Sequence, residues 1–485
     1  MTDLRPVLFV TGLVLAVLAL AMGLPAMVDA VSGNSDWLVF TASAGITLFL
    51  GLSLAAANLA ARRAEFTIRQ TFLLPVAGLL AASLAGSFPF AFSHLHLSAT
   101  DAWFEAVSGV TTTGSTVLHG LPHMPPGILM WRALLQWLGG AGFLLVSFTV
   151  LPDLGVGGMQ MFRLESSGAV GSDRVMSRGA RTVLLVLLTY LLLTLLFTIL
   201  LWLAGMGGFD ALLHAMGTVS TGGFSSSDGS IGSWHKPGVD WVILLGMLMS
   251  GAPFILYPQI AQRRWAQVRG NSQLRWYLSL IVLSALAIAA WLLLTHNAKP
   301  LPALRHGLFA ATSVLTSTGY ATLDWGGWGG LPLVILFFLM FVGGCAGSPA
   351  GGLKIFRLQV LFASARIQLA RLVRPHAVLL PTYERCQISG AVRESVLGHL
   401  FLYCLSFAIL AMLLGMVGMD FLTALTAAAA ALGNLGAGLT ERVGPMTGYA
   451  HLPDNAKWLL SAAMLYGRLE LYLLLVVLSP DFWKN

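Results

Sequence analysis

Four short polar segments, each centred on glycine, interrupt an otherwise apolar chain. We call them strips 1 to 4, and they read TTTGS at 111–115, VSTGGFS at 219–225, TSTGYAT at 316–322 and LGNLGAG at 432–438. Glycine adopts backbone angles that other residues disfavour, so a glycine can turn consecutive carbonyl oxygens in one direction. A ring of carbonyl and hydroxyl oxygens can replace the water shell of an alkali cation. The strips therefore indicate cation binding.

The strips recur at a nearly constant interval. Their central glycines, Gly114, Gly222, Gly319 and Gly436, are separated by 108, 97 and 117 residues. Each strip follows an apolar segment too short to cross a membrane and precedes a longer one, so we predict four copies of one unit. Ordinary outer loops would not repeat at the same place in each unit. The candidate cation-binding residues are Thr112, Thr113, Gly114, Ser220, Thr221, Gly222, Ser317, Thr318, Gly319, Asn434, Leu435 and Gly436.

The elements that must hold the strips are membrane-spanning helices. The chain has 485 residues, and only 10% of them are charged, against about 25% in a typical soluble protein. Its mean hydropathy is +0.81. Apolar runs of about 20 residues, long enough to cross a bilayer, recur along it. We predict an all-α polytopic membrane protein with ten spans, at 6–31, 36–60, 71–94, 127–152, 180–205, 239–261, 276–295, 331–372 (interrupted), 395–418 and 457–480.

The repeated unit divides the chain into five regions. Residues 1–70 form an N-terminal two-helix region, and the pore repeats follow at 71–152, 153–262, 263–392 and 393–485. The first span could be read as a signal peptide, but its apolar run is longer than such a segment usually has. We therefore expect it to be retained.

The basic residues set the orientation. With the N-terminus inside, cytoplasmic segments hold 20 of the 27 lysines and arginines, outer segments hold six, and Arg468 lies within the last span. Basic residues concentrate in cytoplasmic loops of membrane proteins, so we expect both termini in the cytoplasm and the strips on the outer side. The net charge of +7 is thus a topology signal and does not indicate nucleic-acid binding. The three cysteines form no disulfide framework.

The short segments before the strips are predicted to be half-crossing helices. Asp101 and Asp210 stand where N-caps are expected, Asp420 begins the fourth segment, and the third repeat has no acid there. Each helix would direct its partly negative C-terminal end toward the pore centre, which favours a cation.

Two features below the strips suggest a gate. The eighth span is broken by GGCAGSPAGG at 343–352, which contains Gly343, Gly344, Gly347, Gly351 and Gly352 and is soon followed by Lys354. So many glycines with a proline disfavour a continuous helix. The alternative is a flexible joint, but in the sequence this span alone is interrupted. Arg468 is an ionisable residue at membrane depth, which usually faces the protein interior. A pair with Glu470 is disfavoured because residues two apart on a helix point to different faces.

Taken together, the four strips resemble the Trk/Ktr/HKT superfamily of potassium transporters, in which one chain carries four channel-like repeats. The likeness covers residues 71–480, and the two extra N-terminal spans and GRLE at 467–470 are most similar to the bacterial Trk-type subunits TrkH and TrkG. The resemblance implies a homodimer in the bacterial inner membrane and an intramembrane gate at 343–352. It also implies control by a TrkA-like cytosolic RCK/KTN nucleotide-binding ring protein. Ala437 and Pro349 depart from the residues frequent in that family.

Three classes of function were weighed. A gated potassium-conducting pore is preferred, with potassium as transported ion and no other cofactor. A secondary transporter coupling potassium to sodium or protons is the alternative, although such carriers commonly have inverted repeats. A membrane enzyme would need a catalytic constellation that the sequence does not offer. The histidine pairs His94 and His96, and His119 and His123, lie in outer segments and are expected to be solvated loop residues.

Overall fold

The protein is built almost entirely of helices. The computed structural model describes residues 3–63, 65–154, 156–158, 175–376, 379–384 and 386–484. Within these ranges the strands are β1 (Thr382–Tyr383) and β2 (Cys386–Gln387), which pair antiparallel. Arg163, Arg174 and Arg385, which were counted among the cytoplasmic basic residues, lie outside the described residues.

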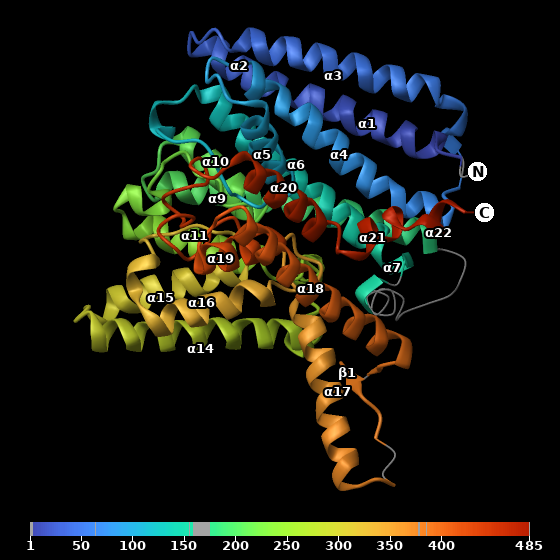
Figure 1. Ribbon diagram of the computed structural model, residues 1–485, viewed down its shortest axis with the longest axis vertical. Helices are drawn as coiled ribbons and strands as arrows, with labels where there is room; N and C mark the ends of the chain where they lie inside the picture. Colours follow the sequence, from blue (N-terminus) through green and yellow to red (C-terminus); the bar gives the residue numbers. More distant parts are fainter. Residues whose placement is uncertain are drawn as a thin grey trace.

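The N-terminal region packs as a pair of long helices. It comprises α1 (Arg5–Ala21), α2 (Gly23–Val31), α3 (Trp37–Ala57) and η1 (Leu59–Arg63). A Cβ on Gly12 would collide with the backbone of α3 at Gly51, and a Cβ on Gly51 would collide with α1. Small residues let the backbones of membrane helices approach closely. These helices lie along one edge of the molecule, beside α4 (Figure 1).

The rest of the chain repeats one order of elements: a long helix, a short helix, a strip and a further helix. The first unit contains α4 (Ile68–Phe92), α5 (Ala99–Val110), η2 (Leu121–His123), α6 (Pro126–Thr149), α7 (Leu151–Leu154) and η3 (Val156–Gly158). The second contains α9 (Val175–Leu203), α10 (Gly208–Val219), η5 (Ser230–Trp234), α11 (Pro237–Ser250), α12 (Leu256–Ala261) and α13 (Trp265–Gly270).

The third unit contains α14 (Ser272–Thr295), α15 (Pro300–Leu315), η6 (Gly326–Trp328), α16 (Gly330–Val342) and α17 (Ile355–Val373). The fourth contains α18 (Gly390–Met416), α19 (Phe421–Leu432), α20 (Asp454–Arg468), α21 (Tyr472–Leu478) and α22 (Pro480–Trp483). The four-unit helical architecture predicted from the glycine spacing is therefore confirmed. We call α5, α10, α15 and α19 the pore helices.

The caps of the pore helices differ from the prediction at two of three acids. Asp420 is the N-cap of α19, and its carboxylate accepts from the amide of Thr423. The N-cap of α5 is Ser98 rather than Asp101, and that of α10 is Gly207 rather than Asp210. Both of these aspartates lie in the first helical turn instead. A carboxylate there still faces the positive end of the helix.

Seven of the ten expected spans are helical and long and apolar enough to cross a membrane, and the first of them is formed by α1 and α2 together. The tenth is the pair α20 and α21, bent by 108°, so the expectation of a continuous span at 457–480 was wrong. The sixth and eighth end as short apolar helices, at Ser250 and Val342. The eighth is thus not the only interrupted span, because the helices that follow strips 2 and 4 are also broken.

Beyond the break in the third unit, α17 leaves the bundle. It runs at a steep angle to α14 and projects, with the β1–β2 hairpin, away from the other helices (Figure 1). The expected span at 331–372 therefore does not continue in line through the break. Both ends of the chain reach the start of α4, where Gln70 donates to the carbonyl of Asp3 at 2.6 Å and Arg69 to that of Lys484 at 2.7 Å.

Candidate functional site

Each pore helix ends in the same turn, a Schellman motif. In this motif an amide N–H beyond the helix bonds a carbonyl five residues earlier, and the preceding residue is left-handed. The donor and acceptor pairs are Thr113 and Ser108 at 2.9 Å, Gly222 and Gly217 at 2.8 Å, Thr318 and Ser313 at 2.9 Å, and Leu435 and Ala430 at 2.9 Å. The left-handed residues, with φ of 50° to 53°, are Thr112, Thr221, Ser317 and Asn434.

This turn fixes which residues are equivalent among the strips. The residue after the motif is a glycine with positive φ in every strip, and these are Gly114, Gly223, Gly319 and Gly436. The predicted alignment was therefore displaced by one residue in strip 2. There the counterparts are Thr221, Gly222 and Gly223, and Ser220 is the helix cap. The sequence could not settle this because Gly222 and Gly223 both fit the pattern.

The four strips close into a ring. A Cβ on the central glycine of each strip would collide with a carbonyl oxygen of another: Gly114 with Gly222, Gly223 with Thr318, Gly319 with Leu435, and Gly436 with Thr113. The contacts run from strip 1 to 2, 2 to 3, 3 to 4 and 4 back to 1. Four strips that are far apart in sequence therefore surround one axis, with a carbonyl at each junction.

Side chains also join neighbouring strips. The Asn434 side chain donates to the Thr113 hydroxyl at 3.0 Å, and the Ser115 hydroxyl donates to the carbonyl of Gly436 at 2.9 Å. Across another junction, the Tyr320 hydroxyl donates to the carbonyl of Phe224 at 3.0 Å. These hydrogen bonds connect neighbouring strips and hold the backbone of the ring in place.

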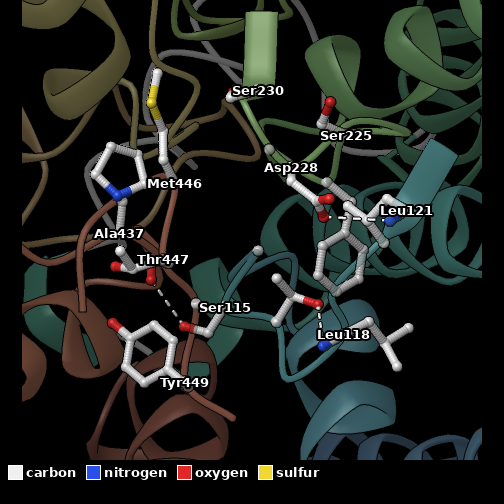
Figure 2. Close-up of a pocket in the computed structure, with 18 of the residues that line it drawn as sticks. Ser115, Leu118, Leu121, Ser225, Asp228, Ser230, Ala437, Met446, Thr447 and Tyr449 are labelled. Carbon is white, nitrogen blue, oxygen red and sulfur yellow. Dashed lines mark hydrogen bonds between the residues drawn. The ribbon is translucent and has the colours of Figure 1, made fainter. Parts of the chain in front are cut away.

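One side of the ring opens into a hollow lined by the ends of all four strips. Figure 2 shows Thr447 and Tyr449 on one side of it and Ser225 and Asp228 on the other. The Asp228 carboxylate accepts from the amide of Leu121 at 3.2 Å and therefore ties the second unit to the first. The hollow therefore reaches the central glycines of all four strips.

The charge around the ring favours a cation. Because the pore helices run directly into the strips, their partly negative C-terminal ends meet at the ring. At the outer end of α19, hydrogen bonds from the hydroxyl and amide of Thr423 lower the pKa of the Asp420 carboxyl. That carboxylate is therefore ionised at neutral pH.

A buried ion pair supports strips 1 and 2, and sequence reasoning missed it. Arg132 had been counted as an outer-segment cation, but it lies inside α6 and its side chain is 2% exposed. Its Nε is 2.7 Å from Glu105 of α5, and it donates to the Ser225 carbonyl and the Thr116 hydroxyl. The signal was an ionisable residue within an apolar span, which usually has a function or a partner.

The predicted gate residues lie together against strips 3 and 4, outside the lining of that hollow. The amide of Gly351 donates to the hydroxyl of Ser317 in strip 3 at 2.6 Å, and a Cβ on Gly351 would meet the carbonyl of Gly433 in strip 4. The same segment bonds the broken end of α11, because the amide of Cys345 donates to the Gly251 carbonyl at 3.0 Å. The residues with positive φ are Gly343, Gly347, Gly352 and Lys354. Gly344 packs against Ala350 within the segment.

Two cations hold this segment. The guanidinium of Arg468 donates to the carbonyl of Pro349 at 2.7 Å and lies 4.0 Å from the centre of the Phe143 ring. The ammonium of Lys354 donates to the carbonyls of Ser348 and Ala350. Both side chains are buried. Arg468 therefore meets the 343–352 segment directly, across the space between the third and fourth units.

Glu470 pairs elsewhere, in agreement with the expectation that it does not pair directly with Arg468. Its carboxylate is 2.6 Å from the guanidinium of Arg357 at the start of α17. Arg357 also donates to the carbonyls of Gly157 and Leu353 and contacts His399 at 3.2 Å. This network ties the segment after the break to α18 and to the turn between α20 and α21.

The histidines form no metal site within the described part of the chain, where no cluster of three or more His, Cys, Asp or Glu could hold an ion. His94 bonds the carboxylate of Asp36 in the N-terminal region. That contact joins two outer ends of helices.

Four tandem pore-loop units around a closed ring define a membrane transport protein of the pore-loop class. A family model described as TrkH, a cation transport protein, matches residues 39–484. The chain belongs to this TrkH family. It is 38% identical over 486 residues to the Trk system potassium uptake protein TrkI of Halomonas elongata, covering 99% of this chain and 97% of the relative.

Other known proteins agree with this assignment. The Trk system potassium uptake protein TrkH of Escherichia coli is 34% identical over 485 residues, which cover 99% of each chain. The crystal structure of the potassium transporter TrkH from Vibrio parahaemolyticus matches the whole of both chains with a TM-score of 0.90 and 33% identity. The fold is therefore that of a TrkH protein throughout its length.

Proposed function

We propose that this protein takes up potassium ions through a central, gated pore whose selectivity filter is the ring of four strips. The observation that carries the proposal is the closure of that ring, in which each central glycine meets a carbonyl oxygen of the next strip. Such a ring offers oxygen ligands from four directions to a dehydrated cation. Relatives named as potassium uptake proteins support potassium as that cation.

The filter ligands in this proposal come from the backbone of the Schellman turns and the glycines that follow. They are Thr112, Thr113, Gly114, Thr221, Gly222, Gly223, Ser317, Thr318, Gly319, Asn434, Leu435 and Gly436. All four turns have one orientation and one ring results, which supports a channel-like path. Inverted repeats with a midplane site, typical of coupled carriers, would have a different arrangement.

The gate in this proposal is the segment 343–352 with Lys354 and Arg468. The segment bonds strip 3 and approaches strip 4 from the inner side, so it obstructs the exit from the filter. Arg468 adds a positive charge there and holds the segment through Pro349. A cation can pass only when the segment and the charge move aside.

The setting of the pore is also a proposal. We place the protein in the bacterial inner membrane with both termini in the cytoplasm, which the excess of basic residues on that side supports.

The projecting α17 exposes Phe362, Leu369 and Val373 and fits a homodimer contact. Its basic neighbours fit a cytosolic ring protein that senses nucleotide. Such a partner would act by binding the open and closed forms with different affinities.

The test is ion uptake by the purified protein in liposomes. Vesicles loaded with potassium should accumulate tracer rubidium down its electrical gradient, and external potassium should compete far better than sodium. A Gly319→Ala variant should lose this preference. Equal competition by sodium in the parent protein would reject a potassium filter.

A further inference from the structure

Strip 2 lacks a side chain that the other strips have. The residue that precedes the central glycine is Thr113, Thr318 or Leu435 in strips 1, 3 and 4, but Gly222 in strip 2. In strips 1 and 3 this threonine bonds a hydroxyl two residues earlier, with Oγ1 to Oγ1 distances of 2.7 and 2.8 Å. Strip 2 has a matching hydroxyl at Ser220 but no threonine to bond it.

The side chain of Gln136 occupies the missing position. Gln136 is completely buried on α6, and a Cβ on Gly222 would collide with its carboxamide. The carboxamide therefore fills, from another unit of the chain, the space that a side chain of strip 2 would take. Gln136 lies four residues after Arg132, so both side chains leave the same face of α6.

The carboxamide bonds the strip on both sides of its central glycine. Nε2 donates to the carbonyl of Gly222 at 2.6 Å, and Oε1 accepts from the amide of Phe224 at 3.1 Å. These two bonds fix the orientation of the carboxamide, because the carbonyl can only accept and the amide can only donate. The carbonyl held in this way is the one that meets Gly114 at the junction of strips 1 and 2.

We infer that Gln136 is a specificity-determining positioning residue, which sets the Gly222 carbonyl of strip 2 for potassium in place of a side chain of the strip itself. The inference rests on the proposed function of the ring as a potassium filter. Two consecutive glycines leave the backbone unusually free. Without the carboxamide, the peptide between Gly222 and Gly223 can rotate and withdraw one ligand from the ring.

The first experiment removes the hydrogen bonds and keeps the volume. Gln136→Met should lower the ratio of potassium to sodium permeability by about fivefold, the factor that roughly 1 kcal/mol corresponds to. Leu145→Ala, at an exposed position on the same helix, should leave the ratio unchanged. The ratio is read from reversal potentials of the reconstituted protein. An unchanged ratio in a folded Gln136→Met variant would overturn the inference.

The second experiment restores the arrangement of strips 1 and 3. Gly222→Thr alone should lower the potassium to sodium permeability ratio, because the Cβ of the new residue collides with the Gln136 carboxamide. Combined with Gln136→Ala, the new threonine gains space and can bond Ser220, as Thr113 bonds Thr111. The double variant should therefore be more selective than either single variant. Additive losses in the double variant would contradict a shared position, since additivity is typical of sites that share neither contacts nor space.

The parent protein separates this inference from the proposed function. If the parent does not select potassium, the filter proposal fails. If the parent selects potassium and Gln136→Met does so equally, the filter stands and only the role of Gln136 fails. Thermal unfolding of each purified variant shows whether a loss of selectivity reflects a loss of folding.

Discussion

At the scale of single residues, the central glycines are required by space as well as by backbone angle. Gly319 has a φ of 80°, and a Cβ there would collide with the carbonyl of Leu435. Side chains rarely adopt such angles, and in this case the colliding atom is itself a candidate ligand. A substitution must therefore move the oxygen that the cation needs.

Gly319→Ser should lower the potassium to sodium permeability ratio by about tenfold or more. Displacing one ligand should weaken the filter's preference for potassium by more than about 1.4 kcal/mol, which corresponds to that factor. Gly330→Ser is the matched control, because nothing lies within 4 Å of a Cβ at that position. Bi-ionic reversal potentials measure the ratio. Equal ratios in both variants would remove Gly319 from the filter.

Arg468 allows a second test at this scale. Its guanidinium bonds Pro349, and within the described chain its Nε and second terminal nitrogen have no hydrogen-bond partner. Arg468→Ala removes this charge and should raise potassium flux several-fold. Arg275→Ala, which removes an exposed arginine of α14, should not. If folded Arg468→Ala conducts no more than the parent, Arg468 is no barrier.

Sequence reasoning reached the glycines but not the side chains behind them. Composition and the period of the strips were enough to predict the helical fold, the pore helices and three of four strip alignments. The alignment of strip 2 depended on the left-handed φ of Thr221, which two adjacent glycines conceal. Arg132 and Gln136 act across units, so no local pattern showed what they bind.

At the scale of elements, the break in the third unit joins strip 3 to the projecting helix α17. The segment 343–352 bonds strip 3, while α17 immediately after it leaves the bundle (Figure 1). A force on α17 can therefore reach the filter exit through a few residues. Ordering or displacing such a segment is a common form of switching.

Deleting residues 346–350 should raise basal potassium flux and weaken control by the proposed cytosolic ring protein. The deletion removes the carbonyls that Arg468 and Lys354 hold. Flux is compared with and without the ring protein, in the parent and the deletion variant. Unchanged basal flux and unchanged control would make the break a passive joint.

The buried pair of Arg357 and Glu470 fastens the elements around this break. Glu470→Gln leaves the buried Arg357 charge without a counter-charge and should destabilise the protein by about 3–5 kcal/mol. Arg442→Ala breaks an exposed pair with Asp420, whose side chains are 67% and 50% exposed, and should change stability little. Thermal unfolding in detergent compares the two. Equal unfolding midpoints in the two variants would show that the buried pair does not stabilise the fold.

At the scale of the whole molecule, the four units have one orientation and both termini meet the start of α4. The distribution of basic residues supports the proposed topology, with the termini inside and the strips outside. In a chain with Cys345, Cys386 and Cys404 replaced by serine, Glu441→Cys should react with a membrane-impermeant maleimide in intact cells. Lys484→Cys should react only after permeabilisation. The reverse pattern would invert the topology.

The central claim is that one ring of four strips passes potassium by itself, without coupling to a second ion. The most direct measurement is the reversal potential of the reconstituted protein with potassium on one side and sodium on the other. It should follow the potassium gradient and remain unchanged when a proton gradient is added. A reversal potential that shifts with the proton gradient, or potassium uptake against its own gradient driven by sodium, would contradict the account and identify a coupled transporter.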